Sequence, residues 1–199
     1  MTPTTQATAP LDIMDDDTLD QAIATAKAHA AELRKWAQMW WDAWNTQDLD
    51  GVVALVHEDI VYEDPSMMGE HIRGRAQFRA FVEMFFRAFP DALFEQSEWP
   101  IYLATEGVGV AAPWRVTGTF TGDMRGGPSP MALAPTGKRV DIKGVDLYEY
   151  RDGLLHKWAS VVNPLEMLEQ LGIAPVRSAL PILVRVQRAL APLVRILGK

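Results

Sequence analysis

The spacing of the apolar residues changes at Pro90 in this chain of 199 residues, and that change constrains the fold most. Before Pro90 apolar side chains recur mainly at helical spacing, and in the long segments from 93 to 162 they alternate as in half-buried strands. Helices followed by strands predict an α+β fold, a cone-shaped, curved antiparallel sheet packed on helices. The expected helices cover about 18–46, 52–56, 75–89 and 164–171, and the expected long strands cover 93–105, 109–121, 139–150 and 154–162.

Turn residues separate these strands. Gly107-Val108 and Asp152-Gly153 predict hairpins, the second because Asp-Gly suits a two-residue turn with positive φ. Residues 122–137 contain three prolines and four glycines, and they predict a loop long enough to act as a lid or a subunit contact. Asn163 is the expected cap of the closing helix and Gly172 its expected stop.

The first helix carries a tryptophan stripe. Trp36, Trp40 and Trp44 lie four residues apart and share a face with Leu33 and Ala37. Such a stripe is usually core, but indole rings also form the walls of pockets for flat apolar ligands. Both uses fit the sequence.

The two ends differ from the domain that we expect at 18–174. Residues 1–17 predict a flexible lead. Residues 175–199 carry five basic residues and no acid, whereas the remainder has 14 basic and 26 acidic residues, a charge of −12. At 100° per residue the five cations span about 80°, which predicts an amphipathic tail that Pro181 and Pro192 break into short pieces. The tail could lie on a membrane, but we expect it on the acidic body or on a neighbouring subunit of a homo-oligomer, a dimer or trimer.

Composition excludes several classes of function. A net charge of −7 argues against nucleic acid as a partner. The absence of cysteine excludes a disulfide scaffold, a thiolate metal site and a cysteine nucleophile. The sequence has no secretory signal pattern and no apolar run of about 18 residues, so we expect a cytoplasmic protein without stable membrane insertion. The histidines never fall at metal-ligand spacing and no phosphate-binding loop is present, so we expect neither metal nor cofactor.

One candidate carboxylate stands at the end of a strand. A short helix after the start signal at 48–51 leads into a β-rich run that ends at Asp64, two residues after Tyr62. Pro65 removes a backbone donor and stops the strand, at a position where side chains can face a cavity. The alternative is that Asp64 merely starts a turn before Pro65.

A second carboxylate lies on the apolar side of its strand. With a period of two, Asp146 shares a face with Ile142, Gly144, Tyr148 and Tyr150, while Trp158 and Ser160 share one face of the last strand. A buried acid has a tunable pKa and is a candidate for catalysis. The alternative is a structural ion pair between Asp146 and Arg115 or Lys143.

Two motifs resemble the bacterial ketosteroid isomerases of the nuclear-transport-factor-2-like superfamily. The runs at 48–51 (Asp-Leu-Asp-Gly) and 63–65 (Glu-Asp-Pro) carry the resemblance. It implies that Asp64 is the general base and that Asp146, in the run 145–150, donates a hydrogen bond to an oxyanion. Trp40 stands where that family has its oxyanion tyrosine, and an indole donates one hydrogen bond but does not ionise.

A broader resemblance, over about 32–172, is to SnoaL-like proteins of the same superfamily. It is carried by the runs 117–122, 135–138, 152–153 and 170–172. Such proteins include polyketide cyclases that perform an intramolecular aldol reaction, and the superfamily includes cofactor-free lyases that release formaldehyde from diarylpropanes. Limonene epoxide hydrolase is similar around Tyr62 and Trp158, but its mechanism needs Asp where this chain has Thr117 and Ser160.

These observations predict a cofactor-free lyase or cyclase that makes or breaks a C–C bond, of an aldol or retro-aldol kind that includes formaldehyde release, on an aromatic or polycyclic apolar molecule. Asp64 is the expected base, Asp146 the neutral acid and Tyr62 an orienting hydroxyl. The alternatives are a ketosteroid-type isomerase and a non-catalytic ligand-binding domain. The expected walls and polar contacts of the site are Trp40, Trp114, Trp158, His71, Ser160 and Asn163.

Overall fold

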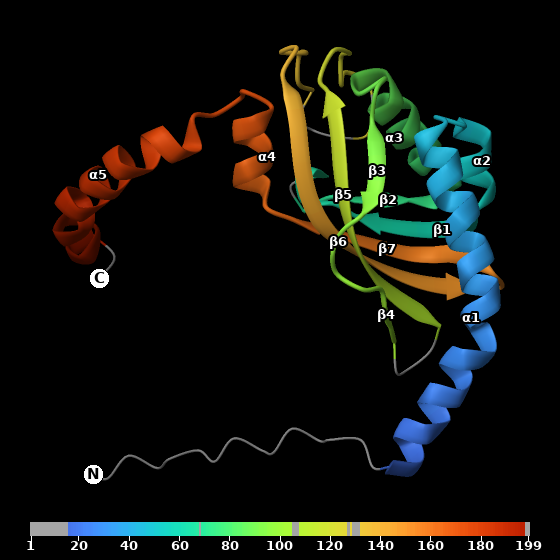
Figure 1. Cartoon of the computed structure of the whole chain (residues 1–199). Coiled ribbons are helices and arrows are strands. Elements are labelled where there is room, and N and C mark those ends of the chain that lie inside the picture. Colours follow the sequence, from blue (N-terminus) through green and yellow to red (C-terminus); the bar gives the residue numbers. More distant parts are fainter. Residues whose placement is uncertain (1–15, 68, 105–107, 127, 129–131, 198–199) are drawn as a thin grey trace, which may run out of the picture.

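A computed structural model describes residues 16–67, 69–104, 108–126, 128 and 132–197. Figure 1 shows a strongly curved sheet with helices packed against it, which confirms the predicted α+β class. The helices are α1 (Asp16–Asn45), α2 (Leu49–Ala54), α3 (Gly74–Ala88), α4 (Pro164–Gln170) and α5 (Val176–Leu197), with a 3-10 turn at Pro65–Met67. The strands are β1 (Val56–Glu63), β2 (His71–Arg73), β3 (Leu93–Gln96), β4 (Tyr102–Leu103), β5 (Gly109–Thr119), β6 (Arg139–Arg151) and β7 (Leu154–Val162).

The strands form one sheet in the order β2-β1-β7-β6-β5-β3, with β4 also paired to β5. Neighbours are antiparallel with one exception, because β1 runs parallel to β7. Antiparallel neighbours can be joined by a tight turn, whereas parallel ones need a long crossover. Here that crossover is the whole chain between Glu63 and Leu154, so no hairpin signal in the sequence indicated the pair.

Two strand predictions need correction. The expected strand 93–105 is divided into β3 and β4, which pair with different parts of β5. Pro100 lies between them and has no N–H for the sheet, which explains the gap. The short strand β2 was expected to be loop, because three residues are too few for a period to show.

Several local signals are confirmed. Asp48 caps α2 by accepting a hydrogen bond from the Gly51 N–H at 2.9 Å. Asp152 and Gly153 both have positive φ angles, 52° and 75°, as the Asp-Gly hairpin requires. Asn163 caps α4, and Gly172 ends it with a φ of 77°. Most of the predicted lead at 1–17, and Gly107 of the other turn, lie outside the described residues.

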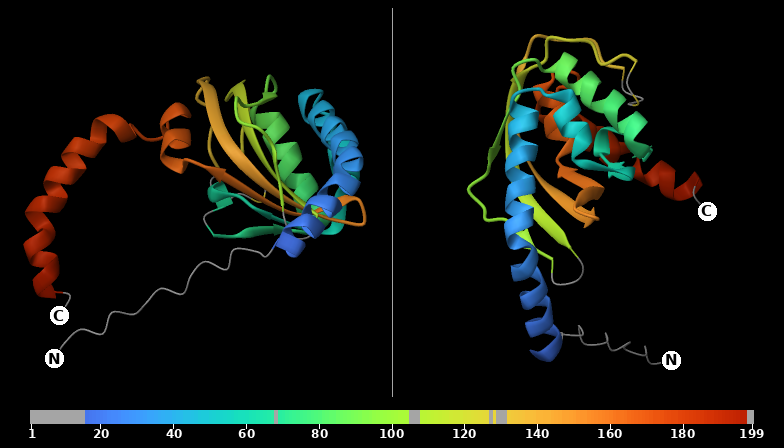
Figure 2. Two further views of the ribbon diagram at one scale, coloured as in Figure 1. Left: turned by 60° about the horizontal axis from the view of Figure 1, so that its bottom comes forward. Right: turned by 90° about the vertical axis from the view of Figure 1, so that its right-hand side faces the viewer.

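The tryptophan stripe of α1 lies in the main core. Trp36, Trp40 and Trp44 are each at most 5% exposed, and they pack with Phe78 of α3 and Trp158 of β7. Figure 2 shows the N-terminal part of α1 extending past the sheet, so that it forms an N-terminal helical extension of the domain. The core therefore lies between α1, α3 and the concave face of the sheet.

The C-terminal helix differs from its prediction. α5 is continuous, although Pro181 and Pro192 were expected to break it. Proline has a helical φ, and the carbonyl that loses its N–H partner can bond to water when the turn is exposed, as all side chains from 180 to 190 are. Figures 1 and 2 show α5 arching away from the sheet, with its main contact at α4. Among the described residues, its apolar side chains from 180 to 190 are not covered by the sheet or by the other helices. No described helix is long and apolar enough to cross a membrane.

Candidate active site

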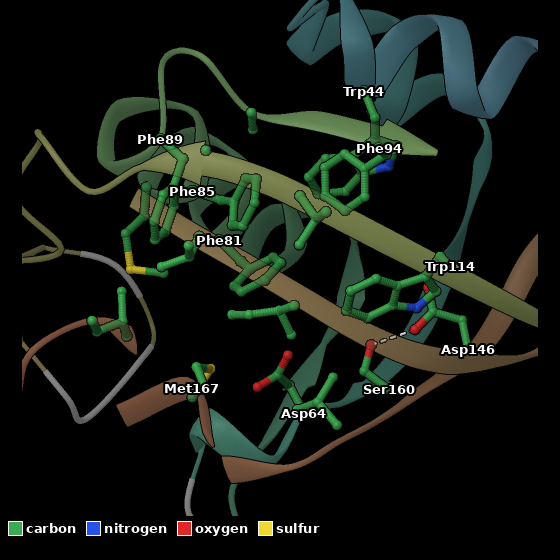
Figure 3. Close-up of a pocket in the computed structure, with 18 of the residues that line it drawn as sticks. Trp44, Asp64, Phe81, Phe85, Phe89, Phe94, Trp114, Asp146, Ser160 and Met167 are labelled. Carbon is green, nitrogen blue, oxygen red and sulfur yellow. Dashed lines mark hydrogen bonds between the residues drawn. The ribbon is translucent and has the colours of Figure 1, made fainter. Parts of the chain in front are cut away.

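A cavity of about 130 Å³ lies between α3, α4 and the concave face of the sheet (Figure 3). Most of its lining is aromatic or aliphatic. None of the described lining residues is Lys, Arg or His. The polar lining residues are Tyr62, Asp64, Thr117, Asp146 and Ser160.

Asp64 follows β1 and points its carboxylate into this cavity. The hydroxyl of Tyr62 donates to Asp64 Oδ2 at 2.5 Å. The Asp64 carbonyl also accepts the Met67 N–H at 2.9 Å, so the residue starts a turn as well as facing the cavity. Burial and the nearby charges of Asp64 and Asp146 raise the pKa of Tyr62 well above its usual value. Tyr62 therefore stays protonated at neutral pH and acts as a donor.

Asp146 lies on the concave face of β6 and is only 5% exposed. Ser160 Oγ donates to its Oδ1 and the Tyr148 hydroxyl to its Oδ2, both at 2.7 Å. Burial raises the pKa of Asp146 to about 6, although hydrogen bonds to the carboxylate act in the opposite direction.

The alternative reading of Asp146 as a structural ion pair is wrong. Arg115 donates to Asp141 at 2.7 Å, and Lys143 donates to Glu98 at 3.1 Å. Residues 115 and 143 alternate with the concave-face positions of β5 and β6, so their side chains lie on the opposite face. No ion pair among the described residues offsets the charge of Asp146, which leaves hydrogen bonds as its stabilisation.

Hydroxyl groups connect the two carboxylates. Tyr62 Oη lies 3.2 Å from Ser160 Oγ, so a chain of contacts runs from Asp64 through Tyr62 and Ser160 to Asp146. With Tyr148 there are four contacts, but Tyr62, Ser160 and Tyr148 supply only three hydroxyl protons. A fourth proton on one of the carboxyl groups satisfies all four contacts at once.

Aromatic rings form the walls around this chain. Tyr62 stacks on Trp158 with ring centroids 3.9 Å apart. The indole N–H groups of Trp44, Trp114 and Trp158 are buried and make no hydrogen bond within the described protein. Those of Trp158 and Trp114 are near enough to Asp146 to lower its pKa. A recess of about 20 Å³ beside the three rings is also lined by Asp146. Donors without a partner suit an oxygen atom of a ligand.

The structure brings together six of the predicted site residues at the cavity: Tyr62, Asp64, Trp114, Asp146, Trp158 and Ser160. It places three elsewhere. Trp40 lines only the small recess and stacks on Trp36 in the core. His71 lies on β2, exposed, 3.9 Å from Glu63. Asn163 is exposed, and its side chain caps α4.

Sequence reasoning missed other lining residues. Trp44 could have been found, because it belongs to the tryptophan stripe, and Tyr148 shares the strand face of Asp146. Met167 and Leu171 of the α4 segment had no such signal, because the position of that helix depends on the whole sheet. The other aromatic rings of the lining are Phe81, Phe85, Phe89 and Phe94. Among the described residues no three His, Asp or Glu side chains converge as metal ligands would.

Residues 34–171 match the sequence model of a family described as SnoaL-like polyketide cyclase. AclR from Streptomyces galilaeus, a candidate hydroxylase, is 28% identical over 73% of this chain and 98% of its own, with a TM-score of 0.57. A candidate SnoaL-like polyketide cyclase from Jannaschia sp. CCS1 is 19% identical over 73% and 94%, with a TM-score of 0.59. A candidate polyketide cyclase from Pseudomonas putida is 21% identical over 68% and 94%, with a TM-score of 0.55. The last two show similarity of fold alone. No match was found among curated proteins.

Proposed function

The chain belongs to the SnoaL-like polyketide cyclase family, and we propose that its cavity performs cofactor-free acid–base chemistry that makes or breaks a C–C bond in an apolar, carbonyl-bearing molecule. The observation that carries the proposal is the hydroxyl chain between the two carboxylates in an otherwise apolar cavity. Binding an apolar ligand does not need two acids in its cavity, whereas moving a proton to and from carbon uses a base and an acid.

In this proposal Asp64 takes a proton from the carbon next to a substrate carbonyl. The C–H electron pair moves toward the carbonyl oxygen, and the resulting enolate attacks a second carbonyl in a cyclisation. In the reverse sense, Asp64 takes the proton of a β-hydroxyl group, the C–C bond breaks to release an aldehyde, and the electron pair of that bond forms the enolate. Asp146 carries the fourth proton and donates a hydrogen bond to the developing oxyanion. Tyr62 and Ser160 connect the two acids, so a proton that arrives on Asp64 can be matched by one that leaves Asp146.

The residues that line the cavity also favour one class of substrate, which is apolar and carries oxygen acceptors. A carboxylate or phosphate group would find no described cation in the cavity, so the part of the substrate that enters it carries no negative charge. The rings of Trp114 and Trp158 favour aromatic or polycyclic bodies, and the unpaired indole N–H groups favour oxygen acceptors.

The test is a panel of uncharged substrates followed by ultraviolet absorbance and product mass, without added metal or nucleotide. It includes polyketide-like esters, diaryl lignin fragments and ketosteroids. A ring closure or released aldehyde supports the proposal. A shifted double bond with unchanged mass and carbon skeleton would indicate an isomerase instead. Tight binding throughout with no turnover would indicate a binding domain.

A further inference from the structure

The helix α5 presents a wide apolar face that no described part of the domain covers. Leu180, Ile182, Leu183, Val186 and Leu190 are between 48% and 61% exposed. A monomeric domain rarely leaves so many large apolar side chains on one element in water, and such a face marks an interaction surface.

All charged residues of α5 are basic. Residues 174–199 contain five cations and no acid. Of the three whose side chains the structure describes, Arg177 pairs with Glu169 at 3.1 Å. Arg185 and Arg188 are exposed. A narrow basic arc beside a broad apolar arc is the pattern of helices that lie in the surface of an anionic bilayer.

The two prolines lie on this basic arc. Pro181 and Pro192 are eleven residues apart, which at 100° per residue places them within about 20° of each other. The carbonyls that they leave without an N–H partner belong to Arg177 and Arg188, on the same arc. Carbonyls on that side can bond to water, while the apolar side keeps its backbone hydrogen bonds. A lipid surface requires that arrangement, because acyl chains offer no hydrogen-bond donors.

We propose that α5 docks on an anionic lipid bilayer, with its apolar arc among the upper acyl chains and its arginines at the headgroups. The remainder of the chain carries a charge of −12 and is repelled by the same surface. That repulsion is limited, because charges are screened over about 8 Å at physiological ionic strength. Figure 1 shows that α5 points away from the acidic domain.

The position of α5 links this surface to the cavity. Helix α4 and the residue after it supply Met167 and Leu171 to the cavity lining, and α5 begins five residues beyond Leu171. A bilayer under α5 therefore lies near one wall of a cavity that accepts uncharged, apolar molecules, which themselves partition into lipid.

The experiment is co-sedimentation of the full chain with vesicles. Vesicles of phosphatidylcholine with phosphatidylglycerol should carry the protein down, and vesicles of phosphatidylcholine alone should carry down much less. Raising the salt concentration should release it. The variant R185S/R188S should lower the partition coefficient by at least about tenfold, since each cation near an anionic surface contributes several-fold. Replacing the apolar residues, L183S/L190S, should lower it by a similar factor.

The matched control is R34S/K35S, which removes two exposed cations from α1 and should leave vesicle binding unchanged. Light scattering on the same samples gives the mass of the assembly. Failure of the wild type to sediment with anionic vesicles would overturn the proposal. So would a lower mass for L183S/L190S with vesicle binding unchanged, because the apolar face would then belong to a second copy of the chain.

Discussion

Asp64 and Asp146 reach one cavity from different strands, and their surroundings differ. Asp64 is half-buried at a strand end, whereas Asp146 is buried among four side-chain donors. The proposed division of roles predicts that Asp64→Asn, which keeps shape but cannot accept a proton, lowers kcat by about 100-fold or more. Folding should persist, as circular dichroism would show. Near wild-type turnover by this variant would mean that another group is the base.

The pKa of Asp146 predicts the pH dependence of the reaction. A group with a pKa of about 6 is protonated below that pH and ionised above it. If protonated Asp146 is the acid, kcat/KM should fall as the pH rises through about 6, and Asp146→Asn should remove this limb of the profile. A rise in kcat/KM as the pH increases through about 6 would instead indicate that ionised Asp146 acts as the base.

Asp146 also affects stability. Folding raises its pKa from 3.8, the value of an unperturbed aspartate, to about 6, so the folded state holds the proton more tightly. The free energy of unfolding therefore falls as pH rises from about 4 to about 6 and stays lower above it. Asp146→Asn should thus increase stability at pH 7 by up to about 3 kcal/mol, and this gain should disappear at pH 4. Urea unfolding at both pH values measures the difference. An equal change in the free energy of unfolding at pH 4 and pH 7 would contradict the pKa shift.

The sequence predicted the two acids of the cavity correctly, but it predicted the side chains around them less well. Asp64 was predicted from Pro65 and Asp146 from strand alternation, and both signals are local. The positions of Trp40 and His71 depend on how α1 and β2 meet the sheet, which no local pattern records. Asn163 was assigned two roles, and the structure shows its helix cap but not a contact with the cavity.

At the scale of elements, the close approach of β5, β6 and β7 shapes the cavity. Gly144 lies opposite Trp114 on β5 and Val162 on β7. A Cβ added at Gly144 would lie 2.5 Å from Cζ2 of Trp114 and 2.8 Å from Cγ1 of Val162. Gly144→Ala should therefore displace the indole, lower stability by about 1–3 kcal/mol and weaken ligand binding.

Intrinsic fluorescence titration with a ligand from the panel, together with thermal unfolding, measures both effects of Gly144→Ala. The neighbouring change Lys143→Ala is the control, because that side chain is exposed and pairs with Glu98 on the other face of the sheet. Unaltered binding by Gly144→Ala would show that Trp114 does not form a wall for the ligand.

The long, regular elements were predictable and the irregular ones were not. β5, β6 and β7 were expected almost at their observed bounds, because alternation over nine or more residues is a strong signal. The division between β3 and β4 and the parallel pairing of β1 with β7 arise from contacts distant in sequence.

At the scale of the whole molecule, α5 contributes little to the stability of the domain. Its side chains from 180 to 190 are exposed, and its ion pair with Glu169 is at the surface. Removing residues 174–199 should therefore change the free energy of unfolding by no more than about 0.5 kcal/mol. Chemical unfolding of the shortened chain measures this change. A large loss would mean that α5 packs on the domain or on a second copy.

The parallel pairing of β1 with β7 has a consequence for the synthesis of the protein. Tyr62 and Ser160 are 98 residues apart in sequence, so the contact between them forms only after nearly the whole domain has been made. At a synthesis rate of about 5–20 residues per second, one edge of β1 stays unpaired for roughly 5–20 s before β7 leaves the ribosome. During that interval the edge offers unpaired backbone groups to other chains. Slow translation between the codons for β1 and β7 should therefore increase aggregation of the nascent protein.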